Sequence, residues 1–421
     1  MTTIHSRMAP ELLGVAETLF LRVREATSDG VGITRESYGR GETVALNILF
    51  EYCREQGLNC IFDAGANLMI SLPDEPPGKV ILIGSHLDSV PQGGNFDGLA
   101  GVVAGILVLL HLKDLPEKQQ RAIRVLALRG EESAWFGKAY MGSLALLGKL
   151  STDDLNLQSR DTGQTLREAM AQLDIPVSRV EQGDPLSDLS NIAAYLELHI
   201  EQGPIMVARE WPIAAVSGIR GNIRHNRILC KGETGHSGAV PRWMRKDAVL
   251  ACAELLSHLD EHWRVLQQMG MDLVMTCGIF STNPASHALS VIPGEVHFSF
   301  EVRSQSDSTL EQFYQLMRNE CQEIARSRGV EFVFDRKLYT APALMDNLWV
   351  ERLSSACKEL GVVSEVVASG AGHDAAVFAN AGVSSGMIFI RNEYGSHNPH
   401  EAMNLEDFFL GVQALNLALN H

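Results

Sequence analysis

An α/β fold is indicated by the segment KVILIGSHLDSVPQGGNFDGLAGVVAGILVLLHL, residues 79–112. The run 79–83 is β-branched and almost continuously apolar, as in a strand that is buried on both faces. The second half of the segment predicts a long helix over 98–113. A buried strand followed by a buried helix is a building unit of sheets whose two faces are covered by helices.

Strand-like and helix-like runs continue to alternate on both sides of this segment. Further strands are expected at 123–128 and 193–198. After residue 347 the pattern predicts a helix, a strand (363–368), a helix, a strand (386–391) and a final helix. This alternation is typical of a mostly parallel sheet with helices on both faces.

The middle of the chain follows a different order. From about residue 213 it predicts two strands, the second at 226–231, then a helix (247–265), two strands (272–280 and 290–303) and a helix (309–327). This order suggests a small α+β sandwich with an antiparallel sheet. We therefore expect an inserted domain at 213–329, with 1–212 and 330–421 forming the larger domain.

Composition narrows the class of protein. The chain of 421 residues has a net charge of −16, which repels phosphate backbones, so no nucleic-acid partner is expected. It also has no basic run that could bind anionic lipid, so no membrane partner is expected. The longest uncharged apolar stretch, 98–112, is shorter than the roughly 20 residues of a membrane span. The N-terminal residues lack an apolar secretion signal. Seven scattered cysteines without a Cys-x-x-Cys pair indicate reduced thiols in a cytoplasmic protein.

Polar side chains follow four of the predicted strands, where ligands bind in open α/β sheets. The residues at these strand ends are His86, Asp88 and Asp97, Glu131 and Glu132, His199, and His397. Imidazole and carboxylate together suit zinc, manganese, cobalt or nickel. The sequence therefore predicts a metal site at the carboxyl edge of the sheet.

Each of these residues also has a commonplace interpretation. Asp97 could cap the next helix, Asp88 could cap a turn, and a lone histidine is usually structural. Glu131 and Glu132 could form a solvated turn, but adjacent carboxylates repel, and at the mouth of a buried strand they need a cation. Asp88 could instead hold the far nitrogen of a metal-bound His86. Coincidence at four strand ends favours the metal site.

Six segments together resemble the M20 metallohydrolases. They are GSHLDSVPQGGNFDGLAGV, RGEESAWF, ELHIEQGPI, GHSGAVPRWMRKDA, SGAGHDAA and GSHNPHEAM, and the resemblance runs from about residue 10 onward. Within that family they are similar to the ureido-hydrolysing branch of N-carbamoyl-L-amino-acid hydrolases, β-ureidopropionases and allantoate amidohydrolases. The short spacing from His86 to Asp97 and the His199 motif favour this branch over the M20 peptidases.

The resemblance implies two divalent metal ions per subunit, zinc or manganese first, with cobalt or nickel as alternatives. It implies that Asp97 bridges the two ions, that Asp88 orients His86, and that Glu131 is the general base. The implied metal ligands are His86, Asp97, Glu132, His199 and His397. The implied reaction is hydrolysis of the ureido C–N bond of an N-carbamoyl amino acid or similar ureido acid, which releases ammonia and carbon dioxide.

The resemblance also implies substrate-binding residues. His236 would reach from one subunit into the active site of the other and stabilise the oxyanion, which makes the protein a homodimer through the inserted domain. Arg303 would clamp the substrate carboxylate, Gln202 would bind the ureido group, and Gly372 would contact the carboxylate through its backbone. Without the resemblance, His236 is a turn histidine, and Arg303 belongs to a surface ion pair as readily as to a clamp.

Three positions depart from the family pattern, and all are positions where we expect the family to recognise its substrate. Trp135 replaces an arginine, which we expect to give the metal mouth an aromatic wall; Ser290 replaces a substrate-binding asparagine; and Tyr394 begins a changed Tyr-Gly-Ser-His sequence. The substrate therefore stays open, with allantoate as the first alternative. A peptidase or N-acyl-amino-acid deacylase is a further alternative, and a non-catalytic metal binder is disfavoured because Glu131 is present.

One motif points elsewhere. Residues 370–375, GAGHDA, satisfy the Gly-x-Gly-x-x-Ala pattern of dinucleotide sites between a strand and a helix. The preceding strand is short, and Asp374 stands where a pyrophosphate would sit. A dinucleotide is therefore not expected.

Overall fold

The computed structural model describes residues 8–115 and 121–420. It divides into two compact units, which we call the larger unit (Met1–Gly218 with Leu344–His421) and the inserted unit (Ile219–Ala343). The strand Ile213–Ile219, which we expected to open the inserted domain, pairs instead with a strand of the larger unit. The inserted unit also continues beyond the expected limit of 329 through two further strands.

The larger unit is built on a nine-stranded sheet with the order β1-β2-β4-β3-β5-β17-β6-β15, and β16 pairs with β6. The four strands β4, β3, β5 and β17 are mutually parallel, whereas β1 with β2, β2 with β4, and β6 with β17 pair antiparallel. The expected mostly parallel α/β sheet is confirmed. The strands are β1 Asn59–Phe62, β2 Leu68–Ser71, β3 Val80–His86, β4 Ala122–Leu128, β5 Ile192–Ile200, β6 Ile213–Ile219, β15 Ala343–Leu344, β16 Val367–Ser369 and β17 Ser385–Ile390.

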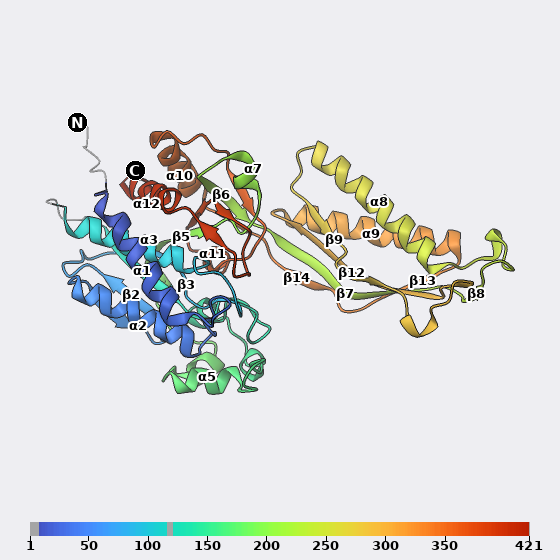
Figure 1. Ribbon diagram of the computed structural model, residues 1–421, viewed down its shortest axis with the longest axis horizontal. Coiled ribbons are helices and arrows are strands. Elements are labelled where there is room, and N and C mark those ends of the chain that lie inside the picture. Colours follow the sequence, from blue (N-terminus) through green and yellow to red (C-terminus); the bar gives the residue numbers. More distant parts are fainter. Residues whose placement is uncertain (1–7, 116–120, 421) are drawn as a thin grey trace. The chain divides into compact units, whose positions relative to one another are not determined.

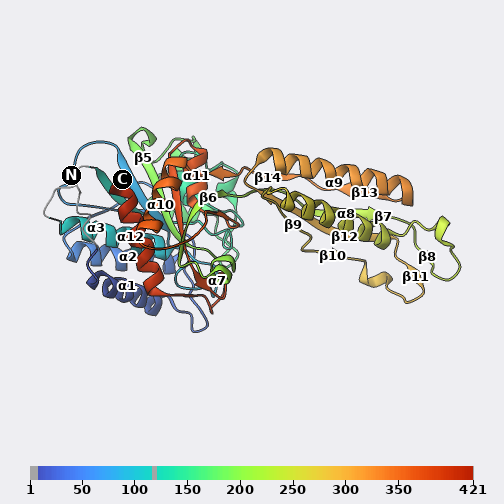
Figure 2. The same cartoon turned by 90° about the horizontal axis from the view of Figure 1, so that it is seen from above.

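Helices cover both faces of this sheet (Figure 1). On one face α3 packs on β3, β4 and β5, α12 packs beside it on β5 and β17, and α1 packs on α3 and α12, while α11 packs against β5 and β17 on the other face (Figure 2). The helices are α1 Glu11–Thr27, α2 Arg40–Glu55, α3 Leu99–Lys113, α4 Met141–Leu146, α5 Leu166–Gln172, α6 Val177–Glu181, α7 Ile205–Arg209, α10 Asn347–Glu359, α11 Asp374–Asn380 and α12 Leu405–Asn420. Residues 99–112 of α3 are all buried, because this helix is apolar all round and lies inside the main core.

Two short strands, β18 Asn392–Glu393 and β19 Ala402–Met403, form a ladder beyond the carboxyl end of β17. They enclose the segment 394–401, which carries His397. The sequence did not predict this ladder.

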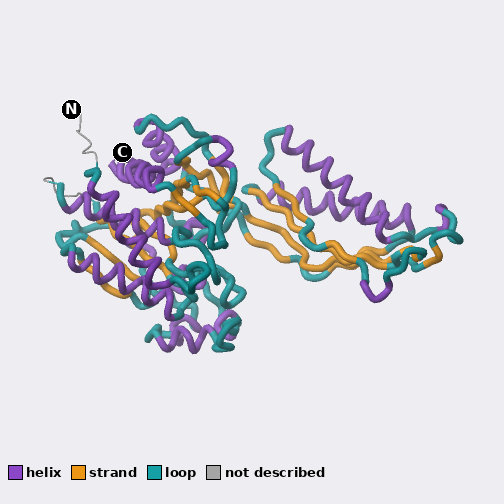
Figure 3. Tube along the Cα trace, in the orientation of Figure 1, coloured by secondary structure: helices purple, strands orange, loops and turns teal. Residues whose placement is uncertain are grey.

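The inserted unit is a two-layer α+β sandwich (Figure 3). Its six-stranded antiparallel sheet has the order β10-β12-β7-β13, with β9 on β12 and β14 on β7. The strands are β7 Gly221–Lys231, β9 Val274–Thr276, β10 Phe280–Ser281, β12 Glu295–Ser304, β13 Glu331–Phe334 and β14 Leu338–Thr340. Two long helices, α8 Ala248–Gln268 and α9 Asp307–Arg328, cover one face and enclose a separate core. A small ladder of β8 Gly235–His236 and β11 Val291–Ile292 stands apart from this sheet.

Among the described residues, no helix combines the length and the apolar character needed to cross a bilayer.

Candidate metal centre

Two histidines meet at the carboxyl edge of the parallel sheet. His86 is the last residue of β3, and His199 lies near the end of β5, its parallel neighbour. Because carboxyl ends of parallel strands lie at the same edge, the two imidazole rings stack with centroids 5.7 Å apart. Both side chains are buried.

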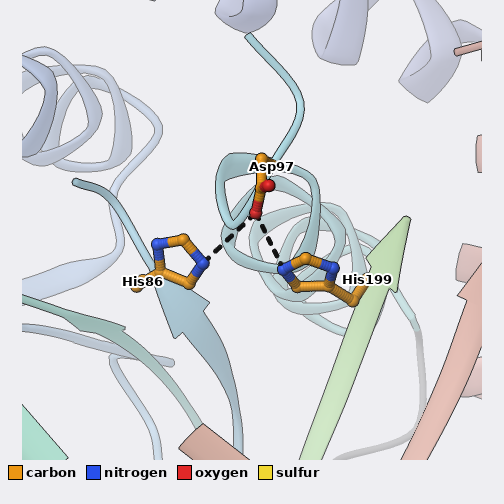
Figure 4. Close-up of side chains that lie close together, drawn as sticks. All are labelled: His86, Asp97 and His199. Carbon is orange, nitrogen blue, oxygen red and sulfur yellow. Dashed lines mark ion pairs between the residues drawn. The ribbon is translucent and has the colours of Figure 1, made fainter. Parts of the chain in front are cut away.

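Asp97 lies between these two rings (Figure 4). Its Oδ1 atom is 3.4 Å from Nε2 of His86 and 3.2 Å from Nε2 of His199. The next residue, Gly98, turns the chain into α3 with a φ of +69°, and a Cβ there would come within 2.6 Å of the His86 ring. Only glycine allows both this backbone conformation and this close approach.

A second group of donors shares the same aspartate. His397 places its Nε2 atom 3.2 Å from Oε1 of Glu132 and 3.5 Å from Oδ2 of Asp97. The ligand atoms of His86, Asp97 and His199 lie within 4.8 Å of one another, and so do those of Asp97, Glu132 and His397. The structure thus brings the five expected ligands into two groups with Asp97 in common.

The donors fit a divalent cation in their hydrogen bonding as well as in their type. Nδ1 of His199 donates to the carbonyl of Ile200 at 2.9 Å, so Nε2 is the unprotonated nitrogen; it accepts the Gly98 amide at 3.3 Å and lies beside Asp97. Nδ1 of His86 is held in the same way by the Asp88 carbonyl at 3.0 Å. Oδ1 of Asp97 is buried yet accepts no hydrogen bond within the described chain. Buried polar atoms are normally paired, so this oxygen has the character of a metal ligand.

Carboxylates and imidazoles of this cluster shift one another's pKa values. Burial opposes ionisation of Asp97, but the nearby His199 and His86 outweigh it and hold the pKa of the carboxyl well below its usual value. Burial likewise lowers the pKa of His86, while Asp88 and Asp97 raise it, with a net shift well above the usual value. The pocket is therefore built for positive charge.

Asp88 connects the ends of β3 and β4. Its two oxygens accept the backbone amides of Glu131 and Glu132 at 3.0 Å each, and Oδ2 also accepts the Ser37 hydroxyl at 2.5 Å. Its Oδ1 atom lies 3.3 Å from Nδ1 of His86. Burial opposes ionisation, but these contacts prevail and keep the pKa of Asp88 below its usual value. Asp88 thus lies against the ring nitrogen of His86 that faces away from Asp97.

Glu131 stands beside the two donor groups without belonging to either. Its Oε2 atom is 4.0 Å from Nε2 of His86, and its side chain is almost buried. Burial raises the pKa of this carboxyl well above its usual value, and the negative charge of Glu132 adds to the rise although His86 opposes it. A carboxyl whose pKa is shifted upward suits the acceptance and return of a proton near neutral pH.

A third cluster of Glu197, His199 and His373 lies behind the centre, and the sequence did not indicate it. Glu197 already has both oxygens occupied, because Oε1 accepts the Ser85 hydroxyl at 2.7 Å and Oε2 accepts the Ala375 amide at 2.9 Å. Glu197 therefore holds the first turn of α11 under the sheet, which we interpret as a structural role.

Two predicted substrate-reading residues lie in the larger unit. Gln202 donates from Nε2 to Oδ2 of Asp97 at 2.7 Å, and its own Oε1 is buried without a hydrogen bond among the described residues. Gly372 packs against the Tyr140 hydroxyl in the loop before α11. Gln202, Tyr394 and His397 all adopt left-handed φ values, of 63°, 64° and 61°. Such strained conformations often cluster at functional sites.

Trp135 is not the aromatic wall that the sequence suggested. Its side chain is 2% exposed and packs in a satellite core with Phe136 and Met141. The indole nitrogen donates to the Ser89 carbonyl at 2.7 Å. After Glu132 the chain passes through exposed Ser133 before it buries Trp135 and Phe136 in this satellite core. Tyr394, in contrast, is 71% exposed.

The inserted unit holds the remaining predicted residues at two different ends. His236 pairs with Val291 in the β8–β11 ladder, and the amide next to it, of Ser237, donates to the Ser290 carbonyl at 2.8 Å. Arg303 instead pairs with Asn222, which also pairs with Thr340 of β14. The strands β14 and β8 lie at opposite ends of this unit (Figure 2). From Glu295 to Arg303 alone, β12 extends roughly 26 Å at about 3.3 Å per residue. His236 and Ser290 thus come together, and Arg303 does not join them within one chain.

Four residues that contact the centre were missed. Ser37 binds Asp88, Ser396 binds Asp97, and Arg35 and Glu401 bind the backbone around Asp97. Ser396 and Glu401 stand inside the quoted segment GSHNPHEAM, so proximity to His397 was an available signal. Arg35 and Ser37 lie between α1 and α2 in a segment without periodicity, and nothing local marks them.

The chain is similar to known proteins in both sequence and fold. Residues 82–421 match the model of peptidase family M20/M25/M40. The chain is 33% identical over 386 residues to an N-carbamoyl-L-amino acid amidohydrolase of Geobacillus stearothermophilus, covering 91% of this chain and 92% of that one. It is 32% identical to an allantoate amidohydrolase of Escherichia coli K12, covering 86% of both. A hydantoinase/carbamoylase family amidase from Burkholderia ambifaria superposes with a TM-score of 0.84 at 26% identity, covering 98% of this chain and 97% of that one.

Proposed function

Because this chain belongs to peptidase family M20/M25/M40, we propose that it is a metal-dependent amidohydrolase acting on a ureido acid. It hydrolyses the ureido C–N bond of an N-carbamoyl amino acid or a similar compound and releases ammonia and carbon dioxide. The observation that carries the proposal is the position of Glu131, beside two donor groups that share Asp97. The names of the relatives support the choice of a ureido substrate.

The proposed mechanism assigns a proton to Glu131 at two stages. Divalent cations at these groups would supply Lewis acidity and lower the pKa of water. Glu131 accepts a proton as water attacks the ureido carbonyl carbon, and it returns that proton to the departing nitrogen. Ammonia leaves, and the remaining carbamate loses carbon dioxide to give the amine-bearing acid. Asp88 holds the backbone of Glu131 during both transfers.

We propose two ions per subunit, zinc or manganese first, with cobalt or nickel as alternatives. The support is that each Asp97 oxygen faces a different group: Oδ1 faces His86 and His199, and Oδ2 faces His397. A mixed imidazole and carboxylate donor set suits all four metals. Gln202 supports a ureido ligand, because its buried Oε1 is an acceptor that a ureido N–H can satisfy.

We also propose a homodimer formed through the inserted unit. A small ureido acid cannot bridge the distance of roughly 26 Å along β12 that separates Arg303 from the His236 ladder. If both residues bind one substrate, Arg303 and His236 come from different copies of the chain. His236 then stabilises the oxyanion of the partner's substrate. We place the enzyme in the cytoplasm, which agrees with seven free cysteines.

Allantoate is the second candidate substrate. The allantoate amidohydrolase relatives favour it, and allantoate too combines a carboxylate with ureido groups. Peptide or N-acyl-amino-acid hydrolysis is the remaining alternative.

A substrate screen tests the proposal. The purified protein is supplied with manganese, zinc, cobalt or nickel and incubated with N-carbamoyl-L-amino acids, N-carbamoyl-β-alanine, allantoate, ureidoglycolate and N-acetyl amino acids. We expect ammonia from at least one ureido acid and no free amine from the N-acetyl compounds. Hydrolysis of N-acetyl compounds alone would overturn the assignment.

A further inference from the structure

Asp97 belongs to both donor groups, yet it lies in a loop without regular structure. The loop runs from the end of β3 to the start of α3, and only its last residues are held by that helix, where the Leu99 amide donates to the Asp97 carbonyl at 2.8 Å. An error in the position of this one residue would displace donors for both groups at once. Some other part of the chain must therefore hold the loop.

The main chain of Asp97 is bound on both sides. On one side, Oε1 of Glu401 accepts the backbone amides of Phe96 at 2.8 Å and Asp97 at 3.2 Å. On the other side, Nη2 of Arg35 donates to the Asp97 carbonyl at 3.3 Å. Glu401 and Arg35 come from opposite ends of the sequence, so this arrangement exists only in the folded larger unit.

Arg35 is an unusual residue for this position, because its guanidinium is fully buried. Its Nε donates to the Leu87 carbonyl at 2.6 Å and its Nη1 to Oδ1 of Asn95 at 3.3 Å. One planar fork thus ties the His86–Asp88 turn to the Asp97 loop. Burial of a charge is costly and lowers the pKa of Arg35, and the surrounding carboxylates of Glu401 and Asp97 offset part of that cost.

Glu401 reaches the Asp97 side chain as well, through Ser396. The Ser396 hydroxyl lies 2.5 Å from Oδ2 of Asp97 and 2.6 Å from Oε2 of Glu401. A hydroxyl has one proton and can donate to only one of these carboxylates at a time. When the proton turns to Glu401, Oδ2 of Asp97 loses one of its two donors and keeps only the hydrogen bond from Nε2 of Gln202.

Gly94 makes this arrangement possible. A Cβ at position 94 would lie 2.1 Å from the carboxyl carbon of Glu401. Any other residue would push the Glu401 carboxylate away from the amides that it binds, which gives a way to disturb the contact without changing Glu401 itself.

We propose that Arg35 and Glu401 are positioning residues that clamp the backbone of Asp97 from both sides and so fix the carboxylate shared by the two metal groups. Glu401 has the additional task of drawing the Ser396 proton away from Asp97. The inference rests on the proposed function only in taking Asp97 as a metal ligand. It needs no assumption about the substrate.

The test measures metal binding without any substrate. Arg35→Lys keeps the charge but loses the fork, and Glu401→Gln keeps the shape but removes the acceptor for Ser396. Gly94→Ala displaces Glu401. We expect each variant to bind Mn²⁺ or Zn²⁺ about 10- to 100-fold more weakly in competition with a chelator, with both ions of the pair affected. Deuterium exchange of the peptide 87–98 should become faster in the metal-free variants.

Matched controls separate positioning from general loss of stability. Arg124 and Glu75 form a bidentate ion pair elsewhere in the larger unit. Arg124→Lys and Glu75→Gln should lower the melting temperature of the metal-free protein slightly and leave metal affinity unchanged. Arg35→Lys with Glu401→Gln should be non-additive in metal affinity, since both act on one residue.

The outcomes distinguish this inference from the proposed function. If the variants melt at a lower temperature but bind metal as tightly as the wild type, Arg35 and Glu401 have only a structural role and the positioning role is rejected. A wild-type protein that binds no divalent cation would overturn both the clamp and the proposed function. Tight metal binding that weakens in the variants, in a protein that hydrolyses no ureido acid, would uphold the clamp and reject the substrate assignment alone.

Discussion

Asp88 and Glu132 are joined across the ends of two parallel strands, because Oδ2 of Asp88 accepts the Glu132 backbone amide at 3.0 Å. The other Asp88 oxygen accepts the amide of Glu131. A single buried carboxylate thus sets the direction in which both neighbouring glutamates leave β4. Asp88 therefore holds both the proposed base, Glu131, and the proposed metal ligand, Glu132.

Replacement of that support should weaken the whole centre. Asp88→Asn substitutes an N–H₂ group for one oxygen, so at least one of the three donors from Ser37, Glu131 and Glu132 loses its acceptor. We expect metal affinity to fall about 10- to 100-fold, as for other residues that orient ligands. Chelator competition on the folded variant measures this. Unaltered affinity would limit Asp88 to a structural role.

Glu131 and Glu132 should respond differently to the same substitution. Glu131→Gln removes the proposed base but no ligand, so bound metal should stay at the wild-type level while turnover falls about 100- to 10,000-fold. Glu132→Gln should instead lose metal from the group that contains His397. Metal analysis alongside steady-state kinetics separates the two. Wild-type turnover in Glu131→Gln would remove this residue from the mechanism.

Metal affinity should depend on pH through His397. The contact with Glu132 raises the pKa of the His397 imidazole to about 9 in the protein without bound metal. A cation needs the neutral ring, so binding at pH 7.5 must release a proton, and affinity should rise with pH up to about 9. Calorimetric titrations in buffers of different ionisation heat count the protons.

The same ion pair affects the stability of the metal-free protein. Because the folded pKa of His397 lies above its unfolded value, the ion pair stabilises the metal-free protein fully below about pH 6.5, and this stabilisation is lost as the pH rises toward 9.

His397→Ala should reduce the number of protons released on metal binding, whereas His400→Ala in the same loop should not. Equal proton release in the two variants would contradict this prediction.

Trp135 should matter for stability rather than for substrate choice. Trp135→Phe leaves the buried Ser89 carbonyl without its indole donor and should lower the free energy of unfolding by about 1–3 kcal/mol. Trp135→Arg buries a charge in an apolar cluster and should be worse. Denaturant titration gives both values. A Trp135→Phe protein with full stability but altered substrate preference would contradict this prediction and would indicate that the ring contacts the substrate.

The homodimer predicts complementation between inactive subunits. His236→Ala lacks the proposed oxyanion donor, and Glu131→Gln lacks the base, so each homodimer should be almost inactive. Mixed dimers contain one site with a wild-type base and a wild-type partner histidine, and they should recover part of the activity. Absence of recovery, with heterodimers demonstrated by differently tagged subunits, would reject the assignment of His236 across the interface.

The sequence indicated the parts of the fold that depend on local pattern. The strands ending at His86 and His199 could be placed because parallel neighbours bring their carboxyl ends together. The strand from Ile213 was assigned to the wrong unit, since it directly precedes the inserted strands. Its continuous apolar run Ile-Ala-Ala-Val at 213–216 was the available sign that it belongs in the middle of the larger sheet, where it is almost entirely buried, whereas burial along β7 is uneven.

The parts that could not be predicted depend on approach between distant segments. Arg35 reaches Asp97 only because the chain between α1 and α2 folds under the ends of β3, and no periodicity encodes that path. Glu401 stood inside a recognised motif, but its role arises from a contact with the loop of Gly94 about 300 residues earlier. Trp135 was misplaced because the direction of a side chain after a strand end is set by tertiary packing.

The order of the strands has a consequence for biosynthesis. β17, residues Ser385–Ile390, is translated after the inserted unit, yet it lies between β5 and β6 in the finished sheet. Until it emerges from the ribosome, two apolar strands have exposed edges that template association with other chains. A product terminated before residue 385 is therefore expected to aggregate or to be retained by chaperones, and a nonsense allele of this kind would burden the cell's quality control besides abolishing catalysis.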